Sequence, residues 1–153
     1  MAVRVGINGF GRIGRSFTRA LLARHADAEI DLVAVNDPMG DSHTLAFLLK
    51  HDSVGRTLPH EIVETDAGFA VDGREIHRLG VMDPAEIPWS DHDVDVVIES
   101  TGLFTAREKA AGHLGGSVRG VTASGTGTVL AQVLQRILAF VPVRPDNMHP
   151  LAQ

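Results

Sequence analysis

Three segments of the chain are almost continuously apolar and short. They cover residues 2–8, 30–36 and 94–100, where Val, Ile, Leu and Ala dominate. Runs of this length and composition are typical of strands buried on both faces of a parallel sheet. Between the first two, apolar residues recur at helical spacing, which predicts a helix over 12–24. The members of that stripe are Ile13, Phe17, Leu21 and Leu22.

Weaker patterns predict the remaining elements. A short helix is expected over 42–50 with Ser42 as its N-cap. Short antiparallel strands are expected around 59–81, because Asp66-Ala67-Gly68 and Asp72-Gly73 signal turns. A further helix is expected over 105–114 and a last strand over 119–124. This order predicts an α/β domain over 1–124, with a doubly wound, mainly parallel sheet and a short antiparallel insertion.

The last part of the chain, 125–153, has a different pattern. An apolar stripe predicts an amphipathic helix over 128–141, which Pro142 would end. Two hypotheses remain open for this segment. Either it covers apolar surface of the domain or joins two copies of the chain, or it is a remnant of a disrupted gene and packs poorly.

A glycine motif follows the first predicted strand and opens the first predicted helix. Its residues are Gly9, Phe10, Gly11, Arg12, Ile13 and Gly14, a G-x-G-x-x-G. In this context the first glycine permits a tight turn, the second lets a pyrophosphate approach the backbone, and the third lets helix and strand pack closely. The free N–H groups at the start of the helix would face the phosphates. The motif predicts a Rossmann-like dinucleotide site.

Asp37 stands at the end of the second predicted strand. Its spacing from the motif is close to the roughly 20 residues expected for the acidic residue that accepts hydrogen bonds from the adenosine ribose. A carboxylate there would repel a 2′-phosphate. NAD is therefore expected to be preferred over NADP.

Composition limits the alternatives. The 153 residues carry a formal charge of −5, which argues against a nucleic-acid partner. There is no cysteine, so thiolate catalysis, disulfides and cysteine-ligated metals are excluded for these residues. No apolar run is long enough to cross a membrane, and the N-terminus does not resemble a signal peptide. A cytoplasmic location is expected.

Five segments together resemble the phosphorylating glyceraldehyde-3-phosphate dehydrogenases, glycolytic enzymes that oxidise an aldehyde with NAD as acceptor. The segments are VGINGFGRIGR (5–15), VAVND (33–37), TLAFLLKHDSVGR (44–56), IPW (87–89) and DVVIESTGLFT (95–105). The similarity runs from about residue 2 to 114 and thins towards Ser124. It covers only the nucleotide-binding half of the family.

The resemblance implies cofactor contacts at matching positions. Arg12 and Ile13 would lie against the pyrophosphate, and Asn36 and Asp37 would hold the adenosine. Further contacts are implied for Ser100, Thr101, Gly102 and Ser124, although Ser124 is equally well explained as a polar residue ending a strand. Met82 is a departure, because the family has an arginine near the adenine there, so only a backbone contact could survive.

The family's catalytic cysteine, its activating histidine and its phosphate sites belong to a second half, and the chain ends near where the cysteine motif would begin. We therefore expect an NAD-binding domain that is catalytically incompetent alone. Two alternatives stay open: half of a split dehydrogenase completed by another chain, or a protein or RNA interaction module that has lost cofactor binding. The eight histidines are interpreted as surface or loop residues, and Asp91, Asp93 and Asp95 as a solvated strand start.

Overall fold

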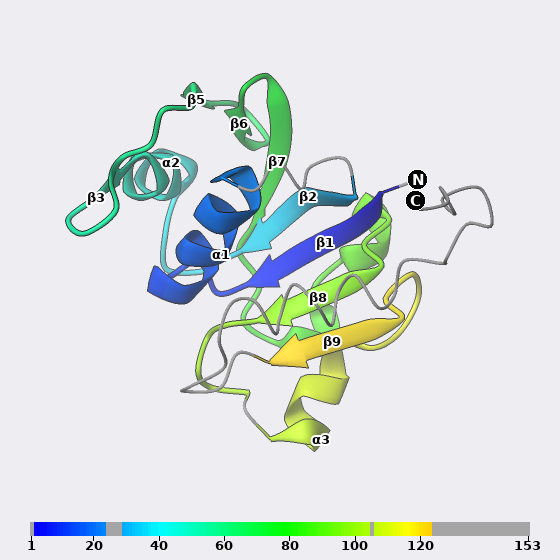
Figure 1. Cartoon of the computed structure of the whole chain (residues 1–153). Helices are drawn as coiled ribbons and strands as arrows, with labels where there is room; N and C mark the ends of the chain where they lie inside the picture. Colours follow the sequence, from blue (N-terminus) through cyan, green and yellow to red (C-terminus); the bar gives the residue numbers. More distant parts are fainter. Residues whose placement is uncertain (1, 24–28, 105, 124–153) are drawn as a thin grey trace, which may run out of the picture.

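A computed structural model describes residues 2–23, 29–104 and 106–123. The helix expected over 128–141, the rest of segment 125–153 and Ser124 lie outside the described residues. The described part is built on a seven-stranded sheet in the order β5-β6-β7-β2-β1-β8-β9 (Figure 1). Its parallel strands are β1 (Val3–Asn8), β2 (Ile30–Asn36), β7 (Arg74–Leu79), β8 (Val96–Glu99) and β9 (Gly120–Ala123).

The antiparallel insertion predicted around 59–81 is confirmed. β5 (Ile62–Glu64) pairs with β6 (Gly68–Val71), which in turn pairs with β7. Asp72 and Gly73 form the tight turn between β6 and β7 with φ values of 48° and 80°. Two consecutive positive φ values are what a two-residue hairpin turn of right-handed twist requires.

Two helices cover one face of the sheet. α1 (Arg12–Ala23) lies where the apolar periodicity predicts it, and α2 (Ser42–Lys50) coincides with the short helix expected over 42–50. The predicted N-cap of α2 was wrong by one residue. Asp41, with extended backbone, caps the helix by accepting a 2.7 Å hydrogen bond from the Thr44 N–H, so Ser42 is the first helical residue.

Shorter elements complete the described part. The helix expected over 105–114 is a single α-turn, α3 (Arg107–Ala110), followed by the 3₁₀ turn η4 (Ala111–His113). The strands β3 (His51–Asp52) and β4 (Arg56–Thr57) pair in a small two-stranded sheet that was not predicted. Two further 3₁₀ turns are η2 (Pro84–Glu86) and η3 (Trp89–His92).

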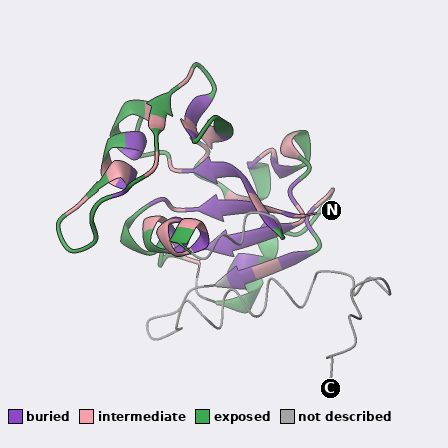
Figure 2. Cartoon of the chain, turned by 45° about the horizontal axis from the view of Figure 1, so that its top comes forward, coloured by how far each residue is buried: buried purple, intermediate pink, exposed green. Residues whose placement is uncertain are grey.

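Apolar side chains form a core on each face of the sheet, and the central strands are buried along most of their length (Figure 2). Val5 and Ile7 face α1 and α2, whereas Gly6, between them, faces the opposite core. A Cβ on Gly6 would lie 2.6 Å from the ring of Trp89. The indole therefore fills the place of a missing side chain, and this contact holds the η3 segment against β1.

Candidate functional site

The predicted site residues gather at the carboxyl ends of the parallel strands. The arrowheads of β1, β2, β8 and β9 point the same way in Figure 1. From β1 the chain proceeds to β2 and β7 on one side and later returns to β8 and β9 on the other. In open α/β sheets, ligands bind at such a reversal of strand order, outside the carboxyl ends.

Two glycines of the turn are required by the fold itself. Gly9 has a φ of 88°, and a Cβ there would lie 2.8 Å from the Thr101 nitrogen. A Cβ on Gly14 would lie 2.5 Å from the Gly9 carbonyl oxygen. The tight turn predicted at Gly9 and the close packing of helix on strand predicted at Gly14 are both confirmed.

Gly11 differs from both. A Cβ on Gly11 would meet no protein atom within 4 Å, and its φ lies outside the left-handed region. The fold therefore leaves room for a side chain at this position. The free space lies at the N-terminus of α1, where backbone N–H groups are available to an anion.

The Asp37 side chain holds two backbone segments together. Its Oδ2 accepts a 3.0 Å hydrogen bond from the Phe10 N–H in the glycine turn, and its Oδ1 accepts one of 3.0 Å from the Met39 N–H. The side chain of Arg78 donates to the Asp37 carbonyl oxygen at 3.0 Å. Each carboxylate oxygen retains a second lone pair for a further donor. The Phe10 ring itself is buried, so this residue would meet a cofactor through its backbone.

The segment after β8 packs directly on the glycine turn. The Ser100 hydroxyl donates to the Gly9 carbonyl at 2.6 Å. Thr101 Oγ1 accepts from the Leu103 N–H at 3.1 Å, and Gly102 has a φ of 75°. The structure thus brings Ser100, Thr101 and the glycine turn together.

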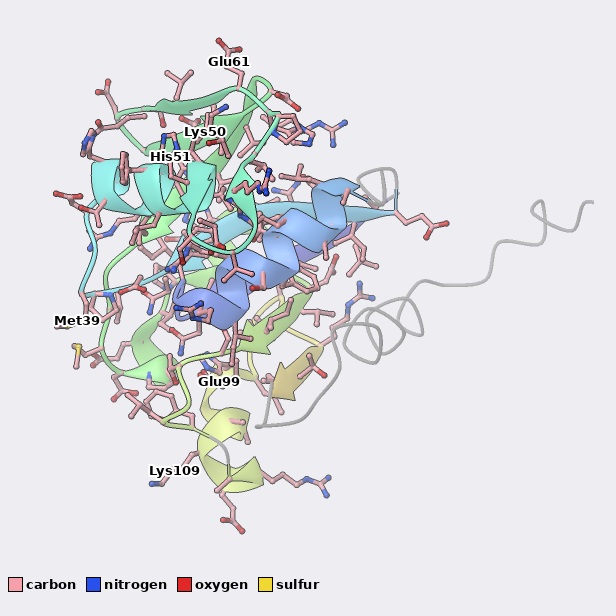
Figure 3. The ribbon with its side chains drawn as sticks, turned by 60° about the vertical axis from the view of Figure 1, so that its left-hand side comes forward. Met39, Lys50, His51, Glu61, Glu99 and Lys109 are labelled. Atoms are coloured by element: carbon pink, nitrogen blue, oxygen red, sulfur yellow. The ribbon has the colours of Figure 1, made fainter. Side chains whose placement is uncertain are left out.

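Four exposed apolar residues follow the carboxyl ends of four different strands. Ile13, Met39, Met82 and Leu103 come after β1, β2, β7 and β8, and their exposed fractions range from 46% to 90%. Figure 3 shows Met39 on the loop after β2. Apolar side chains at this edge suit the faces of an adenine ring.

A buried polar network, which the sequence analysis missed, lies beneath this edge. Asn36 Nδ2 donates to Asn8 Oδ1 at 2.8 Å, and Asn8 Nδ2 donates to Glu99 Oε2 at 2.7 Å. His113 Nε2 lies 2.7 Å from the same Glu99 oxygen. Trp89 Nε1 donates to His113 Nδ1 at 3.2 Å. The network therefore links β2, β1 and β8 to η4 and η3, and Figure 3 shows Glu99 at the end of its strand.

His113 corrects an expectation of the sequence analysis, which placed the histidines on the surface or in loops. Its side chain has no exposed area. Because its Nδ1 accepts from Trp89, the proton of the neutral ring stays on Nε2 and is donated to Glu99. The 3.4 Å approach of Asn8 Nδ2 to this Nε2 is then a contact between two donors rather than a hydrogen bond.

Glu99 remains ionised in this environment. Burial by itself would raise the pKa of the carboxyl group, but hydrogen bonds from His113, Thr101 and Asn8 outweigh it and hold the pKa below its ordinary value. The Thr101 N–H donates to Glu99 Oε1 at 2.8 Å, and the Thr101 hydroxyl donates to the same oxygen.

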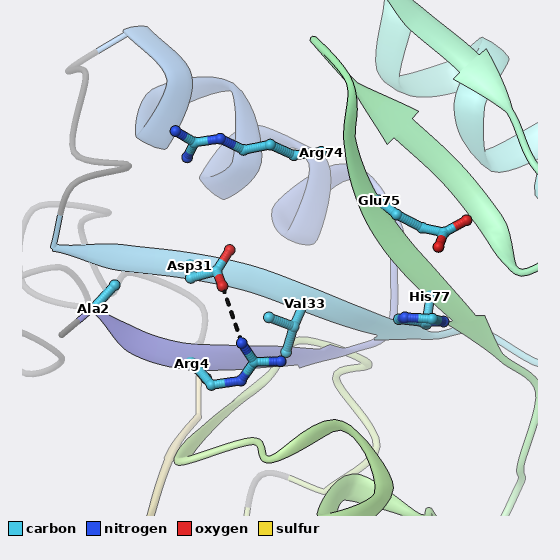
Figure 4. A pocket seen from close by; sticks show the side chains of 7 residues that line it. All are labelled: Ala2, Arg4, Asp31, Val33, Arg74, Glu75 and His77. Atoms are coloured by element: carbon cyan, nitrogen blue, oxygen red, sulfur yellow. Dashed lines mark hydrogen bonds and ion pairs between the residues drawn. The ribbon is translucent and has the colours of Figure 1, made fainter.

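A separate cavity of about 450 Å³ lies at the opposite ends of the strands (Figure 4). It is lined by residues from the amino-terminal ends of β1, β2 and β7, where Arg4 and Asp31 form a 3.3 Å ion pair. This position does not suit a dinucleotide.

In the described ranges, no group of three or more His, Cys, Asp or Glu residues is arranged to hold a metal ion. None of the helices described is long and apolar enough to span a membrane.

Residues 3–107 match the family model described as glyceraldehyde 3-phosphate dehydrogenase, NAD binding domain. The chain belongs to this family. Glyceraldehyde-3-phosphate dehydrogenase of Streptomyces coelicolor is 50% identical over 124 residues, or 81% of this chain and 36% of that protein. Its counterpart in Mycobacterium leprae is 50% identical over 132 residues, or 84% of this chain and 39% of that protein. Glyceraldehyde-3-phosphate dehydrogenase 1 of Bacillus cereus is 49% identical over 121 residues, or 79% of this chain and 35% of that protein.

The chain thus spans little more than a third of the length of these relatives. The NAD-binding domain is what the match covers. The resemblance expected from the sequence motifs, and its restriction to the nucleotide-binding part, are both confirmed.

Proposed function

We propose that the 153 residues hold NAD at the carboxyl edge of the sheet through the glycine turn, Asp37 and the segment Ser100–Gly102. The observation that carries the proposal is the free space at Gly11. Gly9 and Gly14 are glycines because protein atoms leave no room, whereas nothing in the described structure fills the space beside Gly11. A pyrophosphate lying there would account for the glycine at position 11, the second of the motif, and would meet the N–H groups that begin α1.

The chemistry of the site favours NAD over NADP. The Asp37 carboxylate beside the adenosine ribose would accept hydrogen bonds from the two ribose hydroxyls and repel a 2′-phosphate. The guanidinium of Arg78 contacts the backbone carbonyl of Asp37. When the side-chain carboxylate of Asp37 is removed by mutation, this guanidinium would be a partner for a 2′-phosphate.

When bound, NAD would supply the hydride acceptor for aldehyde oxidation. The residues of this chain would bind and orient it. Because none of the 153 residues is a cysteine, the thiol nucleophile of the family's reaction would have to come from another chain or segment.

Calorimetric titration with NAD and NADP tests this function on wild type, Gly11→Ala and Asp37→Ala. Wild type should bind NAD saturably and bind NADP more weakly. Gly11→Ala should keep the melting temperature, since the methyl group meets no protein atom, and lose at least about tenfold in NAD affinity. Asp37→Ala should lower the affinity for NAD and reduce the difference in affinity between NAD and NADP.

Two results would overturn the proposal. A folded wild-type chain that takes up neither cofactor would favour the interaction-module alternative. Undiminished NAD affinity in Gly11→Ala would show that the free space is not the pyrophosphate position.

A further inference from the structure

We propose that Glu99 is a positioning residue for the dinucleotide site, because its carboxylate, itself fixed by His113 and Asn8, sets the orientation of Thr101 against the glycine turn. The inference rests on the proposed NAD binding. It assigns a role to a buried charge that would contact no cofactor.

The link to the site is direct. Glu99 Oε1 accepts both the N–H and the hydroxyl of Thr101. Thr101 in turn lies against Gly9, where a Cβ would come within 2.8 Å of its nitrogen and 2.9 Å of its Cγ2. A small displacement of Thr101 would therefore alter the contact between the two backbone segments that are expected to hold the cofactor. Pre-set geometry of this kind removes an ordering cost from binding.

The arrangement requires an acceptor at both carboxylate oxygens. Oε2 receives donors from Asn8 and His113 at 2.7 Å each, while Oε1 receives the two donors of Thr101. A glutamine has one acceptor oxygen and one NH₂ group. One orientation of that amide would place its NH₂ group against the N–H and hydroxyl of Thr101. The other would place it against the donors of Asn8 and His113.

His113 has no simple means of relieving this conflict. Its ring would have to move the proton to Nδ1 before Nε2 could accept from a glutamine NH₂. The Trp89 indole N–H, which donates to Nδ1 at 3.2 Å, prevents that change. Trp89 thus fixes the tautomer of His113. His113 in turn holds Oε2 of the Glu99 carboxylate, so that Oε1 faces Thr101.

The test compares Glu99→Gln with Glu86→Gln, an exposed carboxylate that undergoes the same change of charge. NAD affinity is measured by calorimetry at a temperature where circular dichroism shows each variant to be folded. We expect affinity to fall about tenfold in Glu99→Gln and to stay within twofold of wild type in Glu86→Gln. A merely structural role would lower the melting temperature of Glu99→Gln and leave the affinity of the folded protein unchanged, which would overturn the proposal.

Adding Trp89→Phe to Glu99→Gln gives a second, independent readout. Removal of the indole N–H frees His113 to change tautomer and to accept from the NH₂ group that the Glu99→Gln substitution introduces. The double variant should therefore lose less affinity than the two single losses combined. Simple additivity would contradict the tautomer argument.

A second pair of variants keeps the test open if Glu99→Gln does not fold. His113→Leu removes the donor to Glu99 and should weaken NAD binding. His113→Gln, which can still donate to Glu99, should restore most of it. Equal affinities for these two variants would reject the inference.

The outcomes separate this inference from the proposed function. Failure of the wild-type chain to bind NAD removes both. If wild type binds NAD and Glu99→Gln binds it with the same affinity, the proposed function stands and only the positioning role is rejected.

Discussion

Gly6 and Gly11 show two opposite reasons for a glycine. At Gly6 the space is taken by Trp89, whereas at Gly11 it is free of protein atoms. Both residues lie in or beside elements that hydrophobic patterning predicts, but the pattern does not distinguish them. The motif spacing marks Gly11 as the position where a phosphate would approach the backbone, because that chemistry is local in sequence, and this role stays a prediction. The contact at Gly6 joins residues far apart in the chain and needed the structure.

Gly6→Ala should destabilise the protein by about 1–3 kcal/mol, because an added methyl group in a filled core forces neighbouring atoms apart. Urea unfolding followed by far-ultraviolet circular dichroism measures the change. Gly11→Ala is the matched control, with the same substitution made into free space. Equal stability of the two variants would contradict the packing described for Trp89.

At the level of elements, the sequence predicted α1 and the central parallel strands of the described sheet because each has a strong apolar pattern, and it predicted α2 from a weaker one. It did not predict β3, β4 or the 3₁₀ turns, which are too short for periodicity to register. The N-cap of α2 was missed because Asp41 and Ser42 are both good capping residues. The backbone decides between them: Asp41 is extended, with φ −82° and ψ 169°, and Ser42 is already helical.

Asp41→Ala should therefore lower the melting temperature by about 2–4 °C, the usual effect of losing a helix cap in a chain of this size. The Ser42→Ala variant should melt within about 1 °C of wild type, since its hydroxyl is not the cap. Thermal unfolding of both variants decides the assignment. A larger loss in Ser42→Ala would favour Ser42 as the cap.

For the whole molecule, the polar network was beyond sequence reasoning for a topological reason. Asn8 and Glu99 meet only because β1 and β8 are neighbours in register, and His113 joins them from a turn after α3. Each residue taken alone is a polar residue at a strand end or in a turn. The candidate cofactor residues were predictable from a motif, whereas the groups that hold them in place depend on the completed sheet.

The network also predicts how stability depends on pH. The pKa of Glu99 is lower in the folded chain than its ordinary value, so the folded state binds the proton less readily than the unfolded state. This stabilisation is complete above the ordinary carboxyl pKa of about 4.3 and is lost as pH falls through the lower, folded value. Urea midpoints between pH 7 and pH 3 should fall more steeply for Glu86→Gln than for Glu99→Gln. Parallel curves would exclude Glu99 as a main source of the acid sensitivity.

Trp89 gives this protein an unusual optical property. It is the single tryptophan, and the chain has no tyrosine, so its indole accounts for nearly all near-ultraviolet absorbance and emission. The same ring packs on Gly6 in the central strand and donates to His113 at one end of the buried network. Light emitted by the protein therefore comes from one known place, between the sheet core and the buried polar groups beneath the carboxyl edge of the sheet, and reports on both without an added label.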